Sequence, residues 1–201
     1  MQAVIANMPP QWLAERQKSE AAQWDEMWNG VLHMPPMPNR LHQNLVGDLR
    51  AFVKFHWARP QGGLVRHEVN LTTPEDEPHW TLNYRIPDLV LVSADRLKID
   101  KNEYMVGAPL VVVETPGDET YEKFPFYARL GVPEIWVINR DTRVPEIYTL
   151  GAEMTYEQLP REIDGWMRSP ATTIQFRQTL TGYLLARLGF DESTTEELPG
   201  R

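Results

Sequence analysis

Two short apolar segments, IPDLVLV (residues 86–92) and LVVVE (residues 110–114), decide the fold of this chain. Both are aliphatic and β-branched, are bounded by proline or glycine, and are too short for helices, so they predict buried strands. Because side chains alternate along a strand, Asp88 shares a face with Val90, and Glu114 shares one with Val112. Antiparallel pairing with Val90 opposite Val112 would place Asp88 beside Glu114.

Directly opposed positions in a sheet hold their Cβ atoms roughly 4.5–5.5 Å apart. Two carboxylates at that distance repel each other unless a shared proton or a divalent cation offsets the charge. A metal site formed by Asp88 and Glu114 is therefore the sharpest interpretation. A metal-independent enzyme that uses the two residues as an acid–base pair is a weaker alternative.

The segment after Glu114 supports a catalytic interpretation. Residues 115–118 predict a turn, and residues 122–130 predict a helix that ends at Gly131. Pro125 is tolerated only in the first turn of a helix, so this helix should begin near Lys123, beside the end of the preceding strand. Residues 134–138 predict the next strand and complete a strand–helix–strand unit with a right-handed crossover.

Composition bounds the class of protein. A chain of 201 residues with 42% hydrophobic and 24% charged residues predicts one domain, residues 1–201, with a core at about 20–190 and a frayed tail at 191–201. No segment is long and apolar enough to span a membrane, and no signal pattern begins the chain. The absence of cysteine excludes disulfides and thiolate sites, so we expect a cytoplasmic protein.

Secondary structure should flank the central unit on both sides. Residues 11–18 predict a surface helix or an oligomer contact, such as that of a homodimer, and residues 24–34 predict a hairpin turned at Asn29-Gly30. Asn39 is a good cap for a long helix. Its core-facing stripe comprises Leu41, Leu45, Leu49, Phe52, Val53 and His56.

The remaining segments add strands and one more helix. Residues 64–71 predict a strand, residues 144–150 and 153–159 a second hairpin, and residues 172–176 an edge strand. Residues 180–188 predict a closing helix that ends at Gly189. The expected fold class is therefore α/β (α+β), with a mixed sheet core flanked by helices and extra β-hairpins.

The net charge of −8 argues against broad attraction to nucleic acid, but basic residues are concentrated between residues 40 and 66. This excess of basic residues is explained most simply by a helix face exposed to solvent. The alternative is a functional patch in which Arg50, Lys54 and Arg59 contact phosphates.

Three more residues are candidates for a supporting role in the site. His42 lies in the first turn of the long helix, and a half-exposed structural histidine is the alternative. Glu26 lies in the first hairpin, and for it too a supporting role in the site competes with a purely structural one. Tyr127 follows Lys123 by one helical turn and would serve either the core or the site.

The chain from about residue 20 to residue 185 resembles the Uma-two family of restriction endonucleases. The resemblance is carried, in order, by WNGVLHMPP (residues 28–36), His42, YRIPD (residues 84–88), ETPGDETYEK (residues 114–123), FYAR (residues 126–129) and GVPEIWVI (residues 131–138).

That family is similar in fold to the PD-(D/E)xK nucleases, which have a mixed α/β core around a four-stranded sheet. The resemblance implies that Asp88 and Glu114 bind Mg²⁺ (or Mn²⁺) and that the protein hydrolyses DNA. It also implies that Lys123 replaces the lysine usually found two residues after the glutamate, where this chain has Pro116. The alternative function is a non-catalytic module that keeps the fold for nucleic-acid or protein binding, which the shortened turn after Glu114 and the acidic charge favour.

Overall fold

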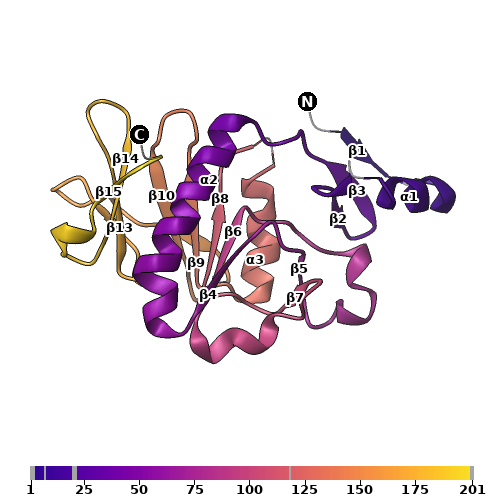
Figure 1. Ribbon diagram of the computed structural model, residues 1–201. Helices are drawn as coiled ribbons and strands as arrows, with labels where there is room; N and C mark the ends of the chain where they lie inside the picture. Colours follow the sequence, from indigo (N-terminus) through magenta and orange to yellow (C-terminus); the bar gives the residue numbers. More distant parts are fainter. Residues whose placement is uncertain (1–2, 7, 20–21, 118, 200–201) are drawn as a thin grey trace.

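The computed structural model describes residues 3–6, 8–19, 22–117 and 119–199, and a six-stranded mixed sheet lies at its centre (Figure 1). Parts of the expected N-terminal segment and C-terminal tail, and Asp118 of the expected turn, lie outside the described residues. The sheet consists of β4 (Leu64–His67), β6 (Leu89–Val92), β8 (Val111–Glu114), β9 (Glu134–Ile138), β10 (Pro145–Leu150) and β11 (Tyr156–Gln158).

The order of the strands is β11-β10-β9-β8-β6-β4. β8 and β9 run parallel and every other neighbouring pair runs antiparallel. Val90 pairs with Val112, as the sequence predicts, and Leu89 pairs with Val113. The next position outward along both chains brings Asp88 beside Glu114.

The helices begin and end where the sequence signals place them. α2 follows Asn39, whose side chain accepts a hydrogen bond from the His42 N–H at 3.0 Å, and α3 has Pro125 in its first turn and ends at Gly131. None of the described helices is long and apolar enough to cross a membrane. The helices are α1 (Pro10–Gln17), α2 (Arg40–Val53), which continues through a π-helical segment (Lys54–Ala58) and a 3₁₀ turn (Arg59–Gln61), α3 (Phe124–Leu130), and further 3₁₀ segments at Glu77–Leu82, Ala94–Ile99, Tyr121–Lys123 and Glu192–Thr194.

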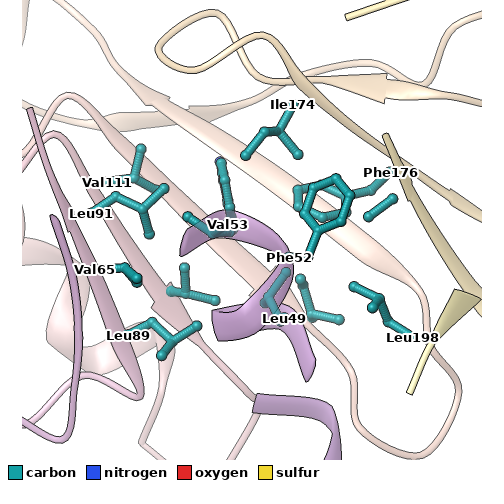
Figure 2. Packing of buried hydrophobic residues seen from close by; sticks show 14 of the residues in the cluster. Leu49, Phe52, Val53, Val65, Leu89, Leu91, Val111, Ile174, Phe176 and Leu198 are labelled. Carbon is teal, nitrogen blue, oxygen red and sulfur yellow. The ribbon is translucent and has the colours of Figure 1, made fainter. Parts of the chain in front are cut away.

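Helices α2 and α3 cover opposite faces of the central sheet. Side chains alternate along β8, so Val111 and Val113 pack toward α2, whereas Val112 packs toward Phe126 and Tyr127 of α3. The side chains on the α2 side of the sheet form one buried hydrophobic cluster. Figure 2 shows Leu49, Phe52 and Val53 of α2 packed among strand residues of this cluster. The predicted stripe of α2 needs one correction, because Leu41 is 46% exposed and His42 is buried in its place.

The C-terminal region forms a second, four-stranded sheet rather than the predicted helix and frayed tail. Residues 180–188 contain strand β14, and residues 191–199 contain a 3₁₀ turn and strand β15, whose Leu198 is 1% exposed. The segment predicted as an edge strand becomes β13, which lies inside this sheet. The sheet is ordered β12 (Met167–Arg168), β13 (Ile174–Gln178), β14 (Leu184–Leu188) and β15 (Glu196–Leu198).

At the opposite end of the molecule, the predicted hairpin forms with Asn29 and Gly30 at positive φ (Figure 1). A third strand, β1, pairs with β3 of this hairpin. The strand predicted for residues 64–71 is interrupted at Glu68, whose φ is 49°, so that its last part pairs elsewhere. These smaller sheets comprise β1 (Ala3–Ile5), β2 (Glu26–Trp28) and β3 (Val31–Met34), and the parallel pair β5 (Leu71–Thr72) and β7 (Met105–Val106).

Candidate active site

A cavity of about 300 Å³ opens where β6 begins and β8 ends. The N-terminal hairpin, the start of α2, the segment before α3 and the loop after β9 complete its walls. The position follows from the register, because the two carboxylates close the ends of adjacent apolar strands. Within the described part of the chain, five acidic side chains line this cavity: Glu26, Glu68, Asp88, Glu114 and Glu119.

Asp88 is held in place by Thr115 and His42. Its Oδ2 atom accepts hydrogen bonds from the backbone N–H of Thr115 at 2.6 Å and from the Thr115 hydroxyl at 2.8 Å. Since that hydroxyl donates its proton to Asp88, it accepts a hydrogen bond from His42 Nδ1 at 2.7 Å. His42 Nε2 lies 3.3 Å from Asp88 Oδ1. These two contacts favour a proton on both ring nitrogens, the imidazolium form of His42.

The pKa shifts of this pair agree with that assignment. Burial acts to lower the pKa of His42, but the hydrogen bond and the charge of Asp88 outweigh it and raise this pKa. Burial acts to raise the pKa of Asp88, but the hydrogen bond and charge of His42 outweigh it and lower this pKa. His42 is 9% exposed, so the alternative of a half-exposed histidine is wrong.

The pKa of Glu114, unlike that of Asp88, is raised. Burial raises its pKa to about 8, and the charges of Asp88 and Glu26 act in the same direction against the opposing charge of Lys123. The Tyr127 hydroxyl donates a hydrogen bond of 2.5 Å to Glu114 Oε1. The sequence allowed Tyr127 a role in the core or in the site. Its side chain is fully buried and its hydroxyl contacts Glu114, so it belongs to both.

Lys123 joins the N-terminal hairpin to the central sheet. Its Nζ atom lies 2.7 Å from Glu26 Oε1 and 3.2 Å from Glu114 Oε1. Burial acts to lower the pKa of Lys123, but the two carboxylates outweigh it and raise this pKa. Lys123 is largely buried, because only 13% of its side-chain surface is accessible.

Glu26 is anchored on both carboxylate oxygens. Oε1 accepts a hydrogen bond from the Ile86 N–H at 3.0 Å, and Oε2 accepts one from Trp28 Nε1 at 2.6 Å. The Trp28 ring stacks on His33 with centroids 4.1 Å apart, and His33 Nδ1 lies 2.7 Å from Glu119 Oε2. The hairpin therefore supplies one carboxylate and one imidazole to the cavity.

The residues predicted to contact DNA lie outside this cavity. Arg50 is on α2, and Lys54 and Arg59 follow it on the π-helical segment and the 3₁₀ turn. At 1.5 Å per residue, Lys54 lies roughly 18 Å along the helix from His42. Arg59 is exposed, and its guanidinium lies 4.7 Å from the centroid of the Phe55 ring.

Sequence reasoning did not assign His33, Glu68, Thr115, Glu119 or Arg140 to the site, although their side chains also line the cavity. Thr115 directly follows Glu114, and that adjacency is a signal that could have identified it. Glu119 lies in the same segment as Glu114, five residues further on. His33, Glu68 and Arg140 come from segments far apart in the chain, so no local pattern predicts that they meet.

The mixed sheet between α2 and α3 defines a restriction-endonuclease-like fold. One solved structure with this similarity is described as "a putative nuclease belonging to DUF820" from Anabaena variabilis ATCC 29413. It has a TM-score of 0.56 and 17% sequence identity, over 79% of this chain and 89% of that one.

The model of the Uma2 family, described as "Putative restriction endonuclease", matches residues 13–181. The chain belongs to this family, which confirms the resemblance found in the sequence. A search of curated proteins finds no match.

Proposed function

We propose that this protein is a metal-dependent endonuclease that hydrolyses DNA phosphodiester bonds, with Asp88 and Glu114 as metal ligands and Lys123 as the assisting residue. The observation that carries the proposal is the meeting of the two carboxylates at adjacent strand ends, with a buried ammonium group at 3.2 Å from one of them. Membership of the Uma2 family supports the nuclease class.

The chemistry of the donors fits Mg²⁺ or Mn²⁺. Among the described residues no group of three His, Asp or Glu side chains is arranged to hold a metal ion. Mg²⁺ commonly binds through only one or two carboxylates and keeps several water molecules, so Asp88 and Glu114 suffice. Burial, together with the charges of Asp88 and Glu26, raises the pKa of Glu114, and a bound cation would stabilise its ionised form. When bound, the ion polarises the scissile phosphate and activates water.

The protein's own groups have separate roles in this proposal. Thr115 and His42 fix the orientation of Asp88 through hydrogen bonds of 2.6 to 2.8 Å and a contact of 3.3 Å. Lys123, with its raised pKa, remains an ammonium group. It therefore orients the attacking water and stabilises negative charge by donating hydrogen bonds, and it does not accept the proton.

The test is cleavage of plasmid and single-stranded DNA with Mg²⁺ or Mn²⁺. Wild-type protein should nick or linearise the substrate, and Asp88→Ala should reduce the rate by orders of magnitude. Asp95→Ala removes an acid whose side chain is 79% exposed and serves as the matched control. Equal rates for wild type and Asp88→Ala would show that the activity arises elsewhere.

A second candidate is a non-catalytic nucleic-acid-binding or protein-binding module. It is favoured by Pro116, which stands where related nucleases have lysine, and by the engagement of Lys123 with two carboxylates. Duplex binding in Ca²⁺ without cleavage in Mg²⁺ or Mn²⁺ would select this function over the first.

A further inference from the structure

Arg140 stands apart from the other basic side chains that line the cavity. The other three described basic side chains of the wall are paired inside it: Lys123 with Glu26 at 2.7 Å, His33 with Glu119 at 2.7 Å, and His42 with Asp88 at 3.3 Å. Arg140 has an acidic neighbour in Asp141, at 3.7 Å between Nε and Oδ2. That distance is too long for a hydrogen bond.

The covered part of the Arg140 side chain lacks a hydrogen-bond partner. Its Nε atom is buried and donates to no acceptor within the described residues, although 34% of the side chain is exposed. Leaving a buried donor unsatisfied is costly, and the cost is greater for a charged group. A guanidinium on the wall of an acidic cavity, with donors still available, is suited to binding an anion from outside.

The loop after β9 fixes the position of Arg140. Asn139 Oδ1 accepts hydrogen bonds from the backbone N–H groups of Asp141 at 2.9 Å and Thr142 at 2.8 Å. β9 runs parallel to β8, with Val137 opposite Glu114. This loop therefore leaves the sheet at the same end of the strands at which the two carboxylates lie. These hydrogen bonds hold the turn without the Arg140 side chain, so a substitution at Arg140 should leave the scaffold intact.

An electrostatic effect of Arg140 on His42 shows that Arg140 lies close to the site. Its positive charge is one of the influences on the pKa of His42, which it acts to lower. The five carboxylates of the cavity repel a polyanion, and the other described cations of its wall are already engaged. A substrate phosphate therefore needs a cation that the site does not neutralise by itself.

We infer that Arg140 binds a non-bridging oxygen of a DNA backbone phosphate next to the scissile one, and so aligns the strand over Asp88 and Glu114. This inference rests on the proposed function. Arg140 is a substrate-binding residue that acts through a bidentate contact, because guanidinium offers two parallel donors to a phosphate. Lysine at this position would supply only a point charge.

The experiment measures binding of a short DNA duplex in Ca²⁺ by fluorescence anisotropy and cleavage in Mg²⁺. Arg140→Gln should weaken binding roughly 10- to 100-fold and lower the slope of log K against log salt by about one unit. Arg140→Lys should keep the slope and lose only part of the affinity. Arg161→Gln removes the same charge from an exposed residue outside the cavity wall and should match wild type.

Phosphate-specific substitution sharpens the test. Neutral methylphosphonate at one position of the duplex should weaken wild-type binding and leave Arg140→Gln binding unchanged. If Arg140→Gln binds like Arg161→Gln, or keeps sensitivity at every position where wild type has it, the inference is overturned while the nuclease function stands. If wild type neither binds nor cleaves DNA, the proposed function fails and the inference fails with it. Unchanged thermal melting of Arg140→Gln verifies folding.

Discussion

The ammonium nitrogen of Lys123 lies 2.7 Å from Glu26 Oε1, so a residue preceding α3 and a residue of the N-terminal hairpin share one buried ion pair. The same nitrogen lies 3.2 Å from Glu114 Oε1. Because Glu26 also accepts the N–H of Ile86, this pair connects the hairpin to the segment that carries Asp88. The hairpin is thus part of the site.

Lys123→Met should destabilise the protein, because it leaves the Glu26 carboxylate buried without its cation. Removing one partner of a buried ion pair typically costs about 3–5 kcal/mol. Urea denaturation at neutral pH measures the loss. In the double variant Glu26→Gln/Lys123→Met, the cost should be smaller than the sum of the single costs, since the second change removes a charge that the first left unpaired. Strict additivity would show that the pair is not coupled.

The stability of the metal-free protein should fall as pH rises. The pKa of Glu114 is about 8 in the folded chain, compared with an ordinary value of 4.5. A carboxyl group whose pKa is raised by folding contributes stability that is fully present below the unfolded pKa and is lost as pH rises through the folded pKa. Wild type should therefore lose more stability than Glu114→Gln between about pH 5 and pH 8.5. Parallel melting curves would contradict this expectation.

The stabilisation of the folded protein by Mn²⁺ should grow as pH rises. Metal binding needs the deprotonated carboxylate, so the rise in melting temperature on adding Mn²⁺ should be larger at about pH 8.5 than at about pH 6. The variant Asp88→Asn/Glu114→Gln should show no such rise at either pH. An equal shift in wild type and double variant would remove these carboxylates from consideration as ligands.

The central sheet and its register could be predicted because the information is local. Aliphatic segments bounded by proline and glycine predict β6 and β8, and the alternation of Asp88 with Val90 and of Glu114 with Val112 predicts which carboxylates meet. The cap at Asn39 and the terminator at Gly131 are equally local signals. Arg140 and Glu68, in contrast, reach the cavity through tertiary packing that no short window encodes.

The error at residues 180–188 has a physical cause. Leucine and alanine favour helices, but this segment also alternates, with Leu184 and Ala186 buried and Leu185 and Arg187 less so. Pairing with β13 on one side and β15 on the other satisfies its backbone groups as a strand. Tertiary context here overrides propensity.

Leu198→Ala tests the order of the C-terminal segment. Leu198 is 1% exposed and packs in the cluster that contains Phe52 of α2, as Figure 2 shows, so truncation should cost about 2–5 kcal/mol. Leu180→Ala is the matched control, because Leu180 is fully exposed and its loss should change stability by less than about 0.5 kcal/mol. Equal unfolding midpoints for the two variants would return residues 191–199 to the frayed tail that the sequence predicts.

The last prediction concerns the basic residues on and after α2. We expect Arg50, Lys54 and Arg59 to contact phosphates flanking the cavity, because they continue along the helix that begins beside His42. Each phosphate contact releases condensed counterions, so removing one residue lowers the slope of log K against log salt by about one unit. Arg50→Ala/Lys54→Ala should therefore lose about two units in a titration of duplex binding in Ca²⁺. An unchanged slope would show that this helix face is only solvated and that DNA approaches from another side of the cavity.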